Sequence, residues 1–263
     1  MDVPMTLGAF NATFSEEFIN LASEAAASTS IPELAFSLFV YSLMAVLALQ
    51  IYREVSKIYS FMEYEGLKYF KNAFLFYGFA NVFLASMTLS LLLAKSSVPA
   101  GLYLMAVVLL PFFFFTGLSL WFAKANLLSS IVWKLVEGTV RKKTLKALFF
   151  ISVMLLVLMD VVVYLLVSVF AGDYIALGYK AVVFVLILLL IRSNMRSGGE
   201  TKPITHPYYL GLILIFTLGF LGNFSIIIEK GSELIGYAFD FLTLLAYVII
   251  LKGIRKWSRI LLK

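Results

Sequence analysis

The chain contains no cysteine and only one histidine, His206, among its 263 residues. The lack of cysteine excludes disulfides, Fe–S clusters, thiolate metal sites and cysteine nucleophiles. A single histidine cannot build a zinc site of the usual composition. The sequence therefore predicts no bound metal and no cofactor.

Charged residues are also scarce, at 14% of the chain, whereas apolar residues make up 62%. This balance is far from that of a soluble globular domain and predicts that a lipid bilayer surrounds the protein. The net charge of +6 does not indicate a nucleic-acid partner, because the basic residues lie in short segments between apolar runs.

Seven apolar runs are long enough to cross a bilayer core of about 30 Å, which takes about 20 residues of helix. The fifth run is the shortest and contains Lys180, so it is the one most open to revision. The fold class predicted is an all-α, polytopic transmembrane helix bundle with seven spans: Pro32 to Tyr52, Phe70 to Ala94, Pro99 to Ala123, Leu145 to Ala171, Tyr174 to Ile191, Pro207 to Ile228 and Leu234 to Leu251.

The basic residues predict the orientation, because short cytoplasmic loops carry an excess of lysine and arginine. Of the 21 basic residues, only Lys95, Lys180 and Lys230 lie outside the first, third and fifth connections and the C-terminal tail. We therefore expect a multi-pass protein of the cell membrane, with its N-terminus outside and its C-terminus in the cytoplasm. The corresponding parts are an extracytoplasmic acidic tail (1–31), a transmembrane domain (32–254) and a basic cytoplasmic tail (255–263).

The connection from Lys124 to Thr144 has two interpretations. Leu127, Ile131 and Leu135 repeat every four residues, which is typical of an interfacial helix anchored by Trp133 in the headgroup layer. In the alternative, the third span simply extends into the cytoplasm.

Ionisable side chains inside spans are informative, because each costs roughly 2.5 to 3.5 kcal/mol near the bilayer centre. Lys180 and Asp240 each lie seven residues below the outer end of a span, and Asn223 lies at nearly the same depth. We predict that these three face one another, with Lys180 paired to Asp240, as the floor of a ligand or ion pocket lined by Tyr179 and Tyr237. A polar clamp that only holds the helices together is the alternative.

Asp160 lies in the middle of the fourth span, where we expect no basic partner at its depth. Asn81 of the second span is the nearest polar candidate. A carboxylate without a cation would take up a proton there, because desolvation disfavours the charged form. Asp160 and Asn81 are therefore candidates for proton coupling, with a neutral, hydrogen-bonded packing role as the alternative.

The polar residues indicate a non-enzymatic, sensor-like protein or accessory subunit that binds a small ligand, a lipid or a membrane protein partner. A small transporter or channel with Asp160 and Asp240 as coupling sites is the second interpretation. A transporter needs polar groups through both halves of the membrane, whereas the inner stretches of spans four and five are almost uniformly apolar.

Overall fold

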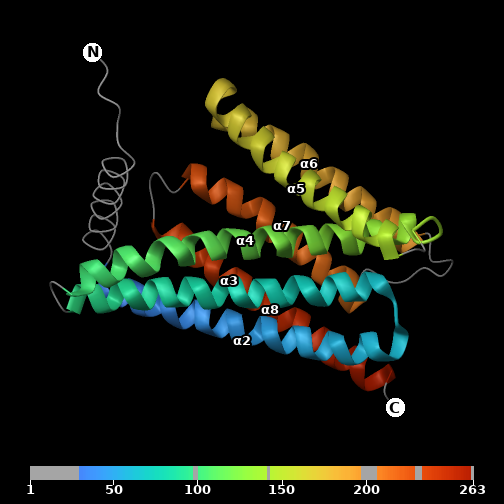
Figure 1. Ribbon diagram of the computed structural model, residues 1–263, viewed down its shortest axis with the longest axis horizontal. Coiled ribbons are helices and arrows are strands. Elements are labelled where there is room, and N and C mark those ends of the chain that lie inside the picture. The colour runs from blue at the N-terminus through green and yellow to red at the C-terminus, as the bar shows by residue number, and fades with distance from the viewer. Residues whose placement is uncertain (1–29, 97–99, 141–142, 197–205, 229–232, 262–263) are drawn as a thin grey trace. The chain divides into compact units, whose positions relative to one another are not determined.

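The computed structural model of the chain describes residues 30–96, 100–140, 143–196, 206–228 and 233–261. Within these ranges the chain forms seven α-helices and no β-strand, so the all-α prediction is confirmed. The predicted N-terminal tail lies almost wholly outside the described residues. The helices, labelled in Figure 1, are α2 (Ile31–Met62), α3 (Glu65–Ser96), α4 (Ala100–Val136), α5 (Lys143–Ala171), α6 (Asp173–Arg196), α7 (Pro207–Ile228) and α8 (Glu233–Leu261).

Six of these helices are long and apolar enough to cross a membrane. The predicted fifth span is one of them, despite its lysine, because Asp173–Met195 of α6 meets the requirement. For the sixth predicted span, α7 is described with its side chains only over Pro207–Leu221, an apolar stretch shorter than a crossing requires. A seventh crossing therefore stays a prediction.

The third predicted span continues without a break as α4 to Val136, so the interfacial-helix interpretation of Lys124 to Thr144 is wrong. Trp133 is not a headgroup anchor: its side chain is only 2% exposed and packs against Tyr69 and Phe149, with ring centroids 5.8 Å away in each case. The four-residue repeat arises because α4 packs against other helices along this stretch.

Local hydrogen bonds explain where helices begin and end. Before α2, the backbone N–H of Ser30 donates to Glu33 Oε2 at 2.6 Å, and that of Glu33 donates to Ser30 Oγ at 3.4 Å. This reciprocal capping box satisfies donors that a helix start otherwise leaves unpaired. Between α5 and α6, Gly172 has a φ of 88°, a conformation that glycine adopts without strain, and its N–H donates to the carbonyl of Ser168 at 3.1 Å.

The helices contribute to two compact units. The first unit comprises Met1–Leu43 and Phe79–Leu118, and its described part contains aromatic contacts between α3 and α4. There, the ring of Phe83 lies 5.7 Å from that of Phe112 and 5.6 Å from that of Phe115, centroid to centroid. These contacts hold the two helices together by aromatic packing.

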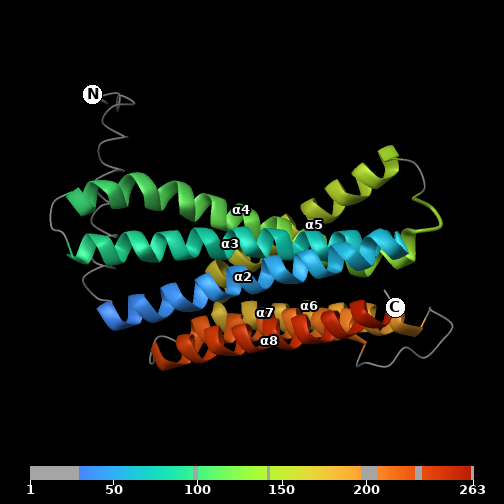
Figure 2. The same cartoon turned by 90° about the horizontal axis from the view of Figure 1, so that it is seen from below.

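The second unit comprises Met44–Gly78 and Ser119–Lys263. Phe70 of α3 is buried and packs edge-on against Tyr208 of α7, with 5.1 Å between centroids. Gly211 allows this approach, because a Cβ atom at that position would lie 3.1 Å from Phe70 Cζ. Helices α7 and α8 lie side by side in this unit (Figure 2).

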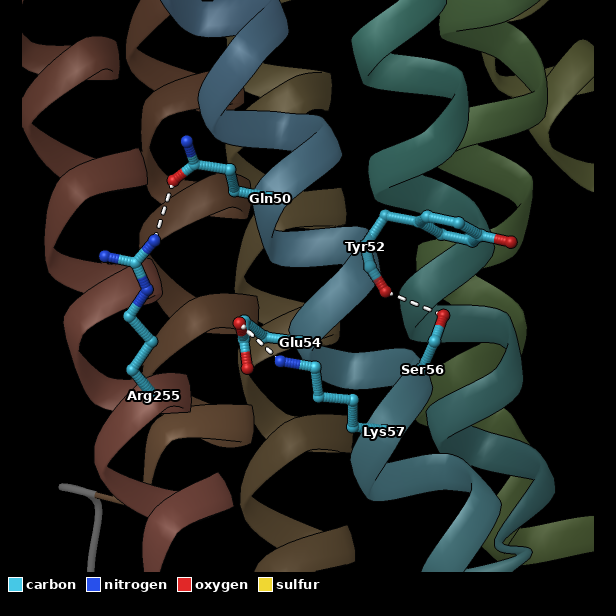
Figure 3. A network of polar contacts seen from close by, with 6 residues as sticks. All are labelled: Gln50, Tyr52, Glu54, Ser56, Lys57 and Arg255. Atoms are coloured by element: carbon cyan, nitrogen blue, oxygen red, sulfur yellow. Dashed lines mark hydrogen bonds and ion pairs between the residues drawn. The ribbon is translucent and has the colours of Figure 1, made fainter.

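A polar contact at the surface of the second unit joins α2 to α8 (Figure 3). The guanidinium of Arg255 donates to Gln50 Oε1 at 2.9 Å, and on α2 itself Lys57 pairs with Glu54 at 2.9 Å. Because Arg255 lies within α8, which ends at Leu261, the described part of the predicted basic tail is a continuation of the last helix.

Among the described residues, two turns contain a residue with a positive φ angle, and substitutions there test the backbone conformation. Glu63, between α2 and α3, has a φ of 48°, so Glu63→Gly should raise the free energy of unfolding by about 1 kcal/mol. Gly172→Ala should lower it by about 1 kcal/mol or more, because alanine is strained at a φ of 88°. Reversible unfolding in detergent micelles measures both changes.

Gly178→Ala is the matched control, because a Cβ atom on this helical glycine meets nothing within 4 Å. Helix propensity predicts a gain of up to about 1 kcal/mol there. Equal effects of the two alanine substitutions would contradict the geometry of the α5–α6 turn.

Candidate functional site

The α5–α6 hairpin brings two charged side chains together in an apolar setting. The two helices lie next to each other (Figure 1) and are joined through Gly172. The ammonium of Lys180 lies 2.5 Å from Asp160 Oδ2 and donates a hydrogen bond to it. Asp160 lies 12 residues before Gly172 and Lys180 lies 8 residues after it, so the pair is well inside both helices.

Aromatic side chains complete the surroundings of this pair. The Tyr179 hydroxyl donates to Asp160 Oδ1 at 3.0 Å, so each carboxylate oxygen accepts one hydrogen bond. The Lys180 ammonium also lies 5.0 Å from the ring centroid of Tyr164 and 5.7 Å from that of Tyr179, within the range of cation–π attraction. Both charges are thus stabilised by more than their mutual attraction.

The pair is only partly covered by protein: the Lys180 side chain is 14% exposed and that of Asp160 is 27% exposed. Neighbouring apolar side chains are far more exposed, as at Met159 (58%) and Val182 (60%). If lipid surrounds this hairpin, the ion pair lies beside a medium that solvates neither charge, where ionic attraction is strong and an unpaired charge is costly.

Helix α4 packs against α5 one turn before Asp160, along the stretch that contains Lys124. One turn earlier on α4, the Trp121 indole N–H donates to the carbonyl of Met154 on α5 at 3.2 Å. The adjacent Ala125 belongs to an apolar cluster with Val157, which is one turn before Asp160.

Two expectations about these residues are wrong. Asp160 has a basic partner, and the ion pair of Lys180 is with Asp160 and not with Asp240. The reason is the length of the lysine side chain. Asp160 is 12 residues from Gly172 along α5, whereas Lys180 is only 8 residues from it along α6. This difference of four residues is about 6 Å along the helix axis, and the flexible lysine side chain is long enough to span it.

The other predicted site residues lie elsewhere. Tyr237 and Asp240 belong to α8, and the side chain of Asn223 on α7 lies outside the described residues. Asn81 is buried on α3 in the first unit, whereas Asp160 belongs to the second. A pocket that these residues share with Lys180 therefore stays a prediction.

Sequence reasoning missed a second polar cluster, which joins α3, α4, α6 and α7. The Ser130 hydroxyl donates to the Gly66 carbonyl at 2.8 Å, and the Tyr208 hydroxyl donates to the Ser130 carbonyl at 2.9 Å. The Asn194 amide donates to the carbonyl of Ile131 at 3.1 Å. All these side chains are buried, and this hydroxyl–amide cluster ties four helices together.

A third set of polar contacts lies where α3 and α5 begin. Glu65 pairs with Lys146 at 2.7 Å and with Lys68 at 3.2 Å, which links α3 to α5. Next to Glu65, burial raises the pKa of the Tyr64 hydroxyl well above its usual range, and the charge of Glu137 acts in the same direction. Tyr64 is therefore a neutral hydroxyl at physiological pH.

Across the described residues, no group of three or more histidine, cysteine, aspartate or glutamate side chains is arranged to hold a metal ion. The Asp160–Lys180 pair offers a carboxylate, an ammonium and a phenol at one place, which suits charge recognition and hydrogen bonding. No family model, curated protein or solved structure matches the chain.

Lys180→Met tests the ion pair. It leaves the Asp160 carboxylate without its cation, so we expect a loss of about 2 to 3 kcal/mol in the free energy of unfolding. The double variant Lys180→Met with Asp160→Leu should recover most of this loss, because an apolar pair leaves no charge to be solvated. Unfolding in detergent micelles measures the coupling energy.

Lys57→Met is the control, because the Lys57 side chain is 47% exposed and its pair with Glu54 is worth less than about 0.5 kcal/mol. Additive effects of the two substitutions at 160 and 180 would show that the pair contributes nothing to stability.

Proposed function

We propose that the chain is an integral membrane protein with seven spans, its N-terminus outside and its C-terminus in the cytoplasm. Six helices that are long and apolar enough to cross a membrane support the membrane assignment. The seventh crossing would be α7, whose 22 residues match the bilayer thickness. The segregation of lysine and arginine supports the orientation, since it places the α4–α5 connection inside and the α5–α6 turn outside.

Within that topology, the protein acts as a non-enzymatic sensor-like protein or accessory subunit that binds a small ligand, a lipid or a protein partner. The observation that carries this proposal is the Asp160–Lys180 ion pair, held well inside two helices whose other exposed side chains are mostly apolar. Apolar side chains of similar volume would hold the hairpin at least as well, so stability alone does not account for the charges.

A transporter or channel, with Asp160 and Asp240 as coupling sites, is the second candidate. The hydroxyl–amide cluster favours it, because Ser130, Asn194 and Tyr208 add polar groups to the half that we assign to the cytoplasmic side. This half is therefore less apolar than the sequence suggested. Against a path for ions, these side chains are buried and hydrogen-bond to neighbouring helices.

The absence of cysteine makes the topology directly testable. We expect Tyr174→Cys, at the exposed start of α6, to react with a membrane-impermeant maleimide in intact cells. Thr139→Cys, in the α4–α5 turn, should react only after the membrane is permeabilised. Mass shift on a gel measures both reactions.

The cysteine-free parent chain is the control for labelling background. Reaction of both variants in intact cells, or of neither after permeabilisation, would contradict the proposed orientation of α5.

Proton flux separates a binding protein from a proton-coupled transporter. In liposomes with an enclosed pH-sensitive dye, the protein should carry no more protons than protein-free liposomes do. Flux that disappears in Asp160→Asn, but persists in Asp173→Asn at the α5–α6 turn, would favour the transporter and contradict the binding role.

A further inference from the structure

Helix α8 carries a row of basic side chains near its C-terminal end. Four exposed residues, three or four positions apart, form this basic face: Lys252, Arg255, Lys256 and Arg259. Because an α-helix turns by about 100° per residue, this spacing places all of them within an arc of about 100° on one side of α8. The opposite side is buried, as at Ile250 and Ile254, which are 1% and 0% exposed. The basic face therefore points away from the core of the second unit.

The basic face has no paired acidic side chain in the described part of the chain. None of its four side chains forms an ion pair there, and α8 contains no aspartate or glutamate after Asp240. Arg255 donates to the uncharged Gln50, whereas Glu54 of α2 is paired with Lys57 (Figure 3). The basic face therefore presents four positive charges to the surroundings of α8.

The same side of α8 is apolar before Lys252. Phe241, Leu245 and Ile249 are 56%, 45% and 40% exposed, and each lies three or four residues from the next, which continues the line of the basic face toward the N-terminus. The change from apolar to basic falls between Ile249 and Lys252, at the end of the predicted span near Leu251. A phospholipid in a bilayer shows the same order, since its acyl chains adjoin the headgroup layer.

We propose that the basic face binds the headgroups of anionic phospholipids, whose acyl chains lie along the apolar residues that precede it on α8. This inference rests on the proposed membrane assignment, but it requires no ligand at the Asp160–Lys180 pair. Ammonium and guanidinium groups donate charge-assisted hydrogen bonds to the phosphate oxygens. A soluble polyanion would match the charges only, whereas an anionic lipid also covers the adjoining apolar side chains.

Native mass spectrometry of the full chain, released from detergent micelles, measures the lipids that it binds. We expect phosphatidylglycerol to bind about tenfold or more tightly than phosphatidylcholine with the same acyl chains. The triple variant Lys252→Gln, Lys256→Gln and Arg259→Gln should bind phosphatidylglycerol about tenfold or more weakly than the parent. Arg255 is kept in this variant, because its hydrogen bond to Gln50 joins α8 to α2. The charge-conserving variant Lys252→Arg, Lys256→Arg and Arg259→Lys should bind as the parent does.

The matched control neutralises two lysines and one arginine on α4, α5 and α6: Lys134→Gln, Lys143→Gln and Arg192→Gln. It lowers the net charge by the same three units and should keep the affinity of the parent. An equal loss in the two glutamine variants would assign the effect to net charge and would overturn the inference. Equal binding of the two lipids by the parent would overturn it as well.

Glycerol phosphate, which has the anionic group but no acyl chain, tests whether the ligand comes from the membrane. At equal concentration it should leave phosphatidylglycerol bound, and displacement would assign the basic face to a soluble phosphate and overturn the lipid. Maleimide labelling of Tyr174→Cys and Thr139→Cys does not depend on lipid affinity. A missing preference for phosphatidylglycerol together with the expected labelling would therefore reject this inference and not the membrane assignment.

Discussion

The ion pair between Asp160 and Lys180 is the interaction that fixes how α5 and α6 align in their hairpin. Apart from this pair, the helices face each other mainly with leucine, valine and isoleucine, which pack almost equally well after a shift of one turn. In lipid no hydrophobic force favours one alignment of such helices over another. A charge pair favours one alignment, because a shift that separates the two groups leaves both charges unsolvated. The hydrogen bond from the Tyr179 hydroxyl to Asp160 favours the same alignment.

The helices themselves could be predicted from the sequence, because length and composition alone decide whether a run can cross a membrane. The lysine in α6 does not prevent this, since its charge is neutralised by a neighbour on α5. The course of α4 beyond Ala123 could not be decided in advance. A four-residue apolar repeat looks the same whether it lies on lipid headgroups or against other helices, and only the burial of Trp133 identifies the second case.

The partners of the site residues were harder to predict than the residues. Counting residues from the helix ends gives the depth of a Cα atom, whereas a lysine ammonium lies several ångströms from it, so Lys180 and Asp160 looked mismatched although they pair. The hydroxyl–amide cluster gave no sequence signal, because serine and tyrosine are ordinary residues of membrane helices. Only the packing of α3, α4 and α7 shows that Ser130, Tyr208 and the Gly66 carbonyl meet.

The two polar groups of the second unit differ in charge. A clamp needs one cation for each carboxylate, and the Asp160–Lys180 pair alone meets that requirement. The hydroxyl–amide cluster shows the contrasting case, since it is uncharged and buried, and its hydroxyl and amide groups donate to neighbouring backbone carbonyls. Packing of α5 against α6 does not require the charges of Asp160 and Lys180, and the proposed binding role rests on this difference between the two groups.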